Sequence, residues 1–325
     1  MLERRRWLAL AAGVCVLPAA AARHEQERLF GSPVDLLVDP GTPRSANAAV
    51  WQGLRSFNTR FNAWKPGELL EANTAFRAGR SLRVSPALQA LLQGAAQMEL
   101  LSGGCFNAGI GALVSQWGFH DDLMRPGARP PVATVQRLAA LQPSLRSLRW
   151  QGRVLRSEQA ALQLDLGGYA KGVALDWALD LLRRSGAQGA LLNLGGNLAV
   201  LGQHGGKPWQ VGIRDPWGPG LIARLAVQGR EAVVTSGSYE RFRVLEGQRV
   251  THILDPRSGQ PAPDLVSVTV VHPQAALADA AATALLVAGA ERWPLVAAGM
   301  GVDQVLVVHR DGRQQATPAL RVRLS

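Results

Sequence analysis

Apolar residues recur along this chain with two spacings, one typical of helices and the other typical of strands. Apolar stripes and helix start signals predict helices over residues 45–65, 86–101, 170–184 and 275–288, and a short helix from residue 134. Apolar runs bounded by turn residues predict strands over 148–150, 154–155, 190–194, 198–201, 209–213, 223–227, 232–236, 242–245, 250–254, 267–272, 305–310 and 320–324. Strands outnumber helices and arrive in runs, so the pattern predicts an α+β fold.

The stretch 164–201 combines these signals with candidate chemistry. Asp165 is expected to close a short strand, Gly167 and Gly168 to form a tight turn, and a helix to begin near Ala170. Such a turn brings backbone N–H groups and the positive helix end to one point, which suits a phosphate. Lys171, one of only three lysines, lies in the first helical turn. The alternative is a plain strand–helix connection, because the pattern is neither GxGxxG nor a P-loop.

Residues 1–22 have the features of a signal peptide. A basic segment at 4–6 precedes an apolar core at 8–17 and small residues at 19–22, and the core is too short for a stable membrane span. The arginines resemble a twin-arginine signal, which exports folded proteins. We therefore expect an exported, periplasmic protein with one compact unit over 23–325. Cys15 leaves association with the inner membrane open.

Composition and charge narrow the functional classes. The chain has 325 residues, 47% of them hydrophobic and 18% charged, which is ordinary for a globular protein. The formal charge is +11, but the arginines are scattered, so a nucleic-acid partner is not expected. Without the expected signal peptide, Cys105 is the only cysteine, and no intramolecular disulfide can form.

Three later stretches carry polar groups. The segment 235–242 offers serine hydroxyls or a simple hairpin turn, and His252 lies on an expected strand, where it is either catalytic or structural. Asp279 and Thr283 stand four residues apart on one predicted helix face. Their oxygens suit Mg²⁺, although an ordinary helix-start Asp with an unrelated Thr fits the same pattern.

The order of the motifs DLGGYAKG, NLGG, TSGSYER, THILDPRSG and SVTVVHPQAALADAAATAL resembles the ApbE family, the FAD:protein FMN transferases. Looser agreement comes from FGSP (30–33), FNAW (61–64) and GGCFNAGIGALVSQWGF (103–119). The resemblance covers roughly residues 29–325 and implies a compact fold with helices packed on a mixed, mostly antiparallel sheet.

The resemblance implies a Mg²⁺-dependent enzyme that splits FAD, attaches FMN by a phosphoester to a Thr or Ser hydroxyl of a partner flavoprotein, and releases AMP. The partner would be a membrane-bound redox subunit. By motif position, Gly168, Asp279 and Thr283 would hold Mg²⁺, and His252 would be catalytic. The FAD site would be lined by Phe30, Trp64, Cys105, Phe106, Asn107, Asp165, Lys171 and Leu254.

The chain departs from the family pattern at a few positions. Asn107 replaces the usual Asp, Asn197 and Ser238 stand where Asp is frequent, and Trp64 replaces a common Tyr. Two other functions stay open: a metal-dependent FAD pyrophosphatase and a non-catalytic periplasmic FAD-binding protein. The presence of His252 together with the Asp–Thr pair argues against the second.

Overall fold

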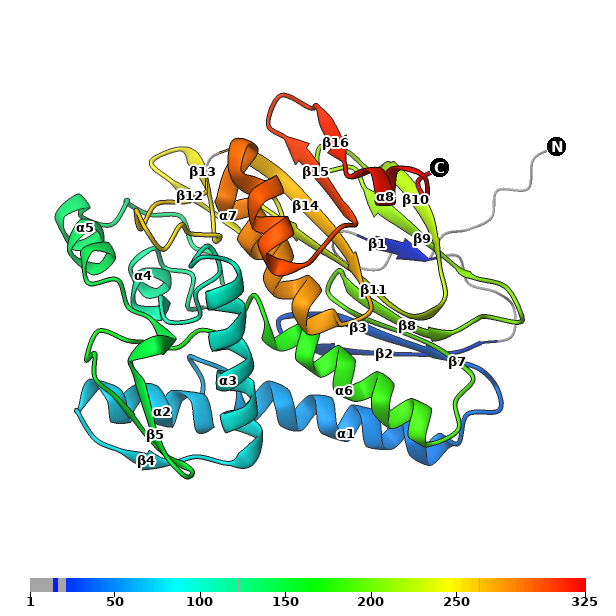
Figure 1. Ribbon diagram of the computed structural model, residues 1–325, viewed down its shortest axis with the longest axis horizontal. Helices are drawn as coiled ribbons and strands as arrows, with labels where there is room; N and C mark the ends of the chain where they lie inside the picture. The colour runs from blue at the N-terminus through cyan, green and yellow to red at the C-terminus, as the bar shows by residue number, and fades with distance from the viewer. Residues whose placement is uncertain (1–13, 17–21, 122, 263) are drawn as a thin grey trace.

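An antiparallel sheet of eight strands forms the centre of the molecule (Figure 1). The computed structural model describes residues 14–16, 22–121, 123–262 and 264–325. In spatial order the strands are β16 (Gln314–Ala316), β15 (Val305–His309), β14 (Leu265–His272), β11 (Gly229–Gly237), β8 (Asn197–Gly202), β7 (Gly189–Leu194), β3 (Ser32–Val38) and β2 (Arg23–Leu29). The α+β prediction is confirmed.

Both faces of this sheet are covered. Helices α6 (Ala170–Arg184) and α7 (Ala275–Met300) pack together on one face, and α1 (Arg44–Arg60) packs against α6 (Figure 1). A small sheet of β1 (Val14–Val16), β9 (Trp209–Arg214) and β10 (Leu221–Val227) shares an apolar cluster with the other face, which helix α8 (Pro318–Arg321) also joins. Because both faces of the sheet are covered, every residue of β7 is buried. For the same reason its sequence does not alternate between apolar and polar residues.

The remaining elements build a second region beside the helices, at the left of Figure 1. Its helices are α2 (Glu68–Arg77), α3 (Pro86–Leu101), α4 (Gly111–Gln116) and α5 (Val132–Ala140), with a 3₁₀ turn at Leu145–Ser147. Its strands are β4 (Leu82–Arg83), β5 (Leu148–Gln151) and β6 (Val154–Ser157), and the hairpin β12 (Phe242–Leu245) and β13 (Gln248–Thr251). Ile110, Leu113, Trp117 and Leu254 belong to the apolar cluster of this region.

Several sequence predictions are confirmed and others are wrong. Helix α3 begins as expected, with the Ser85 hydroxyl accepting the Leu88 N–H at 3.1 Å. The expected strand 320–324 is wrong, because Pro318 starts the short helix α8 and β16 pairs with β15 instead. Asn73 lies between the two predicted helices 45–65 and 86–101, in helix α2, which was not predicted and whose first turn carries two glutamates.

The N-terminal segment is described only in part. Residues 14–16 form β1, which pairs antiparallel with β9, whereas 1–13 and 17–21 lie outside the described residues. The signal peptide therefore stays a prediction. Within the described part of the chain, no helix has the length and apolar character needed to cross a membrane.

Helices α6 and α7 meet at Gly172. A Cβ built there would lie 2.3 Å from the Ala275 carbonyl oxygen, so only glycine permits this approach. One α6 carboxylate, that of Asp176, accepts the N–H groups of Ala275 and Ala276 at 3.0 and 2.9 Å and caps α7 from outside. This junction holds the first turn of α6 against the start of α7.

We predict that Gly172→Ala lowers the free energy of unfolding by about 1–3 kcal/mol, because the added methyl group collides with backbone of α7. Gly41→Ala is the matched control: its Cβ would meet nothing within 4 Å, and the loss of backbone freedom in the unfolded chain should stabilise by about 0.4–1 kcal/mol. Urea unfolding of both variants checks the difference. If Gly172→Ala and Gly41→Ala were equally stable, helix α7 would shift to make room for the added methyl group without a loss of stability.

Candidate functional site

The turn at Gly167 and Gly168 leads into α6 as predicted, but the strand expected before it does not form. Residues 164–166 belong to no strand, and one isolated bridge joins Gln163 to Ile110. The side chain of Asn73 holds Leu164 instead, donating to its carbonyl at 2.9 Å and accepting its N–H at 2.6 Å. A buried amide on α2 thus replaces a neighbouring strand.

Oxygen atoms from three parts of the chain gather beside this turn. A Cβ built at Gly168 would lie 2.8 Å from the Thr283 hydroxyl, which is 3.3 Å from the Ser236 hydroxyl. Asp279 is 3% exposed and accepts the Gly172 N–H at 2.9 Å on one oxygen and the Asn197 amide at 2.8 Å on the other. We call Gly168, Ser236, Asp279 and Thr283 the oxygen cluster.

The donor set of the oxygen cluster fits a hard cation. Each carboxylate oxygen of Asp279 keeps a lone pair beyond its one hydrogen bond, and hydroxyl and carbonyl oxygens complete the set. Among the described residues, no group of three or more His, Cys, Asp or Glu side chains is placed to hold a metal. A cation here would therefore draw much of its coordination from backbone, hydroxyl groups and substrate.

Lys171 supplies positive charge beside this cluster. Burial raises the pKa of Asp279 and raises that of Glu240 to about 7, and in both cases the Lys171 ammonium opposes the change. Among the described residues, neither carboxylate lies within ion-pair distance of Lys171. The ammonium group is thus free to meet an anionic ligand at the positive end of α6.

His252 lies just after β13, not within the strand expected over 250–254. Its Nδ1 and backbone N–H both point to the Arg241 carbonyl, at 2.9 and 3.2 Å. A carbonyl only accepts, so Nδ1 carries the proton and Nε2 is a bare acceptor. Burial and the neighbouring Arg241 guanidinium lower the pKa of His252 to about 4, which keeps the ring neutral at pH 7.

Trp64 and Asp165 form the aromatic side of the site. Burial raises the pKa of Asp165, and its hydrogen bond with the Gly167 N–H, 2.8 Å long, opposes that change. The Arg241 charge and a hydrogen bond with the Trp64 side chain also lower this pKa. The Trp64 ring lies 5.5 Å from the His120 ring, centre to centre. An indole face next to a carboxylate suits a heteroaromatic ligand with N–H groups.

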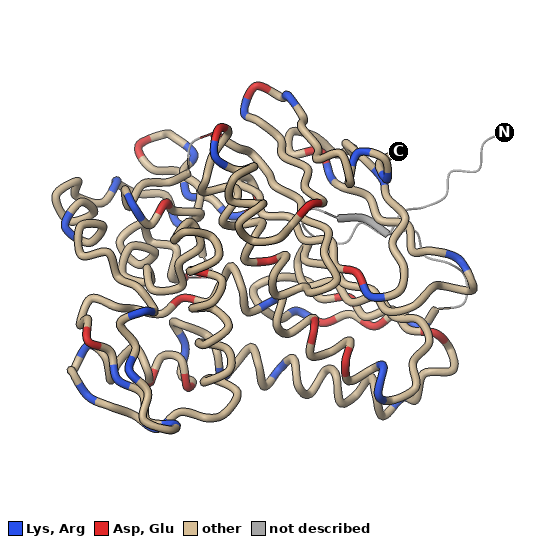
Figure 2. The backbone as a smooth tube through the Cα atoms, viewed as in Figure 1, with Lys and Arg blue, Asp and Glu red and all other residues tan. Residues whose placement is uncertain are grey.

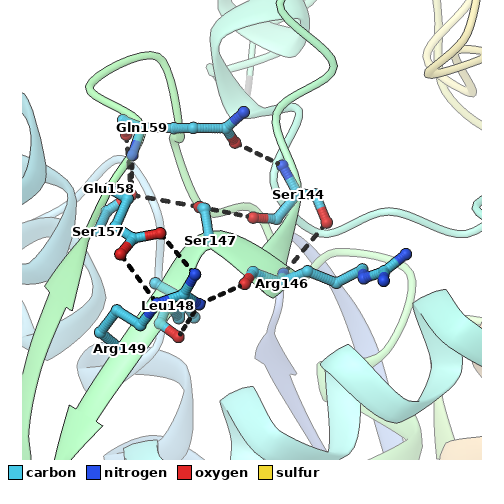
Figure 3. A network of polar contacts seen from close by, with 8 residues as sticks. All are labelled: Ser144, Arg146, Ser147, Leu148, Arg149, Ser157, Glu158 and Gln159. Carbon is cyan, nitrogen blue, oxygen red and sulfur yellow. Dashed lines mark hydrogen bonds and ion pairs between the residues drawn. The ribbon is translucent and has the colours of Figure 1, made fainter.

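Asn107 uses both ends of its amide within the protein. It donates to the Pro143 carbonyl at 2.8 Å and accepts the Gly109 N–H at 2.7 Å. The residue after Pro143, Ser144, is anchored by the buried Glu99 and by the network of Figure 3, in which Ser144 accepts the Arg146 N–H and donates to Gln159. An aspartate at position 107 could not donate to the Pro143 carbonyl. The asparagine found there therefore stabilises this loop with a hydrogen bond that the usual Asp could not make.

The other predicted FAD residues contribute in different ways. Cys105 and Phe106 are 1% and 3% exposed, and the Leu254 side chain is buried in the α4 region, so only their backbone groups can face a ligand. Burial raises the pKa of the Cys105 thiol. Phe30 packs on Phe57 of α1.

Sequence reasoning missed the roles of Asn197, Gly172 and Arg241, which orient Asp279 and His252 through hydrogen bonds. The sequence held a signal for Asn197, the residue directly after the motif NLGG, because Asn stands there where Asp is frequent. A surface cavity of ≈ 540 Å³ lies elsewhere, between β2 and α1, and none of the predicted site residues lines it.

Comparison with known proteins identifies the family of this chain. The sequence pattern of the ApbE family matches residues 30–306. An FAD:protein FMN transferase of Rhodobacter capsulatus is 43% identical over 321 residues, which are 98% of this chain and 61% of that relative. One from Klebsiella pneumoniae is 36% identical over 272 residues, covering 81% of this chain and 82% of the relative. The chain thus spans less than two thirds of the Rhodobacter protein.

Solved structures show the same fold. The ApbE protein of Thermotoga maritima superposes with a TM-score of 0.85 at 25% identity, over 93% of this chain and 99% of that one. The apo flavinyl transferase ApbE of Pseudomonas stutzeri gives 0.79 at 26% identity, over 93% and 96%. The family pattern, these relatives and the shared fold together show that the chain belongs to the ApbE family.

Proposed function

We propose that this protein is an FAD:protein FMN transferase that breaks the pyrophosphate of FAD, joins the FMN phosphate to a Thr or Ser hydroxyl of a partner flavoprotein, and releases AMP. The observation that carries the proposal is the oxygen cluster beside Lys171 at the start of α6, a lysine that forms no ion pair with any described residue. The relatives named FAD:protein FMN transferase support the transfer of FMN from FAD to a protein.

Phosphoryl transfer depends mainly on positioning and on neutralising charge. Lys171, at the positive end of the α6 dipole, would bind the pyrophosphate. Mg²⁺, held by the Gly168 carbonyl, Asp279 and Thr283, would offset the phosphate charge when bound. The indole of Trp64 and the carboxyl group of Asp165 would hold the flavin ring, with backbone groups of 105–107 beside it.

His252 would act on the acceptor hydroxyl. Its neutral ring presents Nε2 as a bare acceptor, so it can receive a hydrogen bond from the hydroxyl and take its proton as the new phosphoester forms. Arg241 positions the ring through its carbonyl and is itself held by the carbonyls of Phe119 and Asp121 at 2.9 and 2.6 Å. The base is therefore fixed before substrate arrives.

The partner and the compartment are further parts of the proposal. Features of residues 1–22 support export to the periplasm, where the acceptor would be a membrane-bound redox subunit that exposes a Thr or Ser. Figure 2 shows basic and acidic positions interspersed along the chain, which gives no support to a nucleic-acid partner.

The test is incubation with FAD, Mg²⁺ and candidate acceptor proteins, read by flavin fluorescence on a denaturing gel and by AMP release. Covalent flavin with stoichiometric AMP is expected. Free FMN and AMP without labelled acceptor would indicate a pyrophosphatase, and FAD binding without AMP would indicate a carrier.

We predict that His252→Ala binds FAD and Mg²⁺ normally but labels its acceptor at least about 10²-fold more slowly, because a positioned base contributes that much. His272→Ala, at the end of β14, is the matched control and should keep full activity. Binding is measured by fluorescence quenching and transfer by covalent flavin. If binding fails together with transfer, the ring is a cofactor ligand.

We predict that Asp279→Asn raises the Mg²⁺ concentration for half-maximal transfer by at least about 10-fold, because a charged ligand is lost while the side-chain shape is kept. Asp311→Asn, at the tip of the β15–β16 hairpin, is the control. Thermal unfolding verifies that both variants fold. An unchanged Mg²⁺ requirement would place the metal elsewhere.

We predict that Cys105→Ala retains transfer within about tenfold of the original protein. Burial raises the pKa of this thiol, so it remains protonated and is a poor nucleophile. The same gel assay measures the rate. Complete loss of transfer in a folded variant that still binds FAD would make the thiol a participant.

A further inference from the structure

Two adjacent residues in the turn between β11 and β12 each carry a buried oxygen atom that has no hydrogen-bond partner among the described residues. These atoms are the Tyr239 hydroxyl and Oε1 of Glu240. Leaving such groups buried and unpaired is costly, and native proteins rarely do so without a ligand or a functional reason. The pair therefore needs an explanation.

Hydrogen bonds on both sides hold the turn in place, so it cannot easily move to give the Tyr239 hydroxyl and the Glu240 oxygen a partner. On one side, Ser238 donates its N–H and its hydroxyl to the Val266 carbonyl on β14, at 2.8 and 3.2 Å. On the other side, the Arg241 carbonyl binds His252 twice. Two anchors, one before and one after, hold Tyr239 and Glu240 in place.

Residues 239 and 240 lie in the chain between Ser236, which belongs to the oxygen cluster, and Arg241, whose carbonyl holds the proposed base His252. Burial raises the pKa of Glu240 to about 7, with the charges of Lys171 and Arg214 opposing the change. The Lys171 charge also lowers the pKa of His252 and opposes the rise in the pKa of Asp279, so the same ammonium charge acts on all three groups. Burial raises the pKa of Tyr239, and the nearby Glu240 charge adds to it, so the phenol keeps its proton.

The chemistry of the pair selects the ligand. A carboxylate disfavours an anion, and the nearby Lys171 and Arg214 disfavour a cation. A neutral hydroxyl satisfies both residues, because it can donate to Glu240 and accept from the Tyr239 O–H.

We propose that Tyr239 and Glu240 form a subsite that binds a hydroxyl group of the substrate. The subsite rests on the proposed function for its two candidate sources, a ribityl hydroxyl of FAD and the acceptor Thr or Ser hydroxyl. Neither residue was assigned a role by its motif, in which only the serines stood out.

The test uses Glu240→Leu and Tyr239→Phe in the otherwise intact protein. Both substitutions remove an unpaired buried group, so thermal stability should stay equal or rise, whereas a structural role predicts that it falls. Ligand binding should weaken by about 10- to 100-fold for Glu240→Leu, as for a hydrogen bond to a charged group. Glu240→Gln keeps an acceptor oxygen and should recover part of that loss. Glu246→Gln, on the exposed β12–β13 turn, is the control.

Two measurements separate the sources. A higher Kd for FAD, from fluorescence quenching, assigns the subsite to the ribityl chain. An unchanged Kd with a raised acceptor KM assigns it to the acceptor hydroxyl. The proposed subsite is contradicted if the FAD Kd and the acceptor KM are both unchanged. It is also contradicted if Glu240→Leu and Tyr239→Phe both lower the thermal stability. If the unmodified protein transfers no flavin to any acceptor, the proposed function fails, and the FAD measurement alone then decides on the subsite.

Discussion

The carboxylate of Asp279 is the point on which the site depends. It is buried, and it accepts one hydrogen bond from the backbone of α6, through Gly172, and one from β8, through Asn197. Because the carboxylate itself belongs to α7, three elements distant in sequence are tied together at one group. The close helix crossing that this requires is possible only because Gly172 has no side chain.

Burial also determines the protonation of the ionisable groups in the candidate site. Removing charged groups from water raises the pKa of Asp165, Glu240 and Asp279 and lowers that of His252. The Lys171 ammonium opposes the rise in the pKa of Glu240 and of Asp279, although it forms an ion pair with neither carboxylate. In the proposed function, a ligand would bring a cation to the carboxylates and phosphate oxygens to the Lys171 ammonium, as a metal–pyrophosphate complex does, and would thereby compensate these buried charges.

Local patterns predicted the parts of the fold that depend on neighbours in sequence. The four-residue spacing of Asp279 and Thr283 follows from helical geometry alone, and the glycine turn before α6 follows from local chemistry. The segment before Asp165 could not be predicted, because Asn73, far away in sequence, supplies its hydrogen bonds. The end of β13 before His252 was not predicted either, because the pairing with β12 that defines this strand ends at Thr251. The burial of the Glu240 oxygen likewise depends on packing that no local pattern shows.

Asn107 and Asn197 stand where Asp is usual or frequent in the family, and the same physical reason applies to both. Each amide donates a hydrogen bond that a carboxylate cannot make, Asn107 to the Pro143 carbonyl and Asn197 to Asp279. An Asp at 197 would set two carboxylates against each other, which is stable only when a proton or a cation lies between them. With Asn there, Asp279 has a fixed orientation without a cation. In the proposed function, the chain would therefore give up one negative charge beside the cation and gain a preorganised carboxylate ligand.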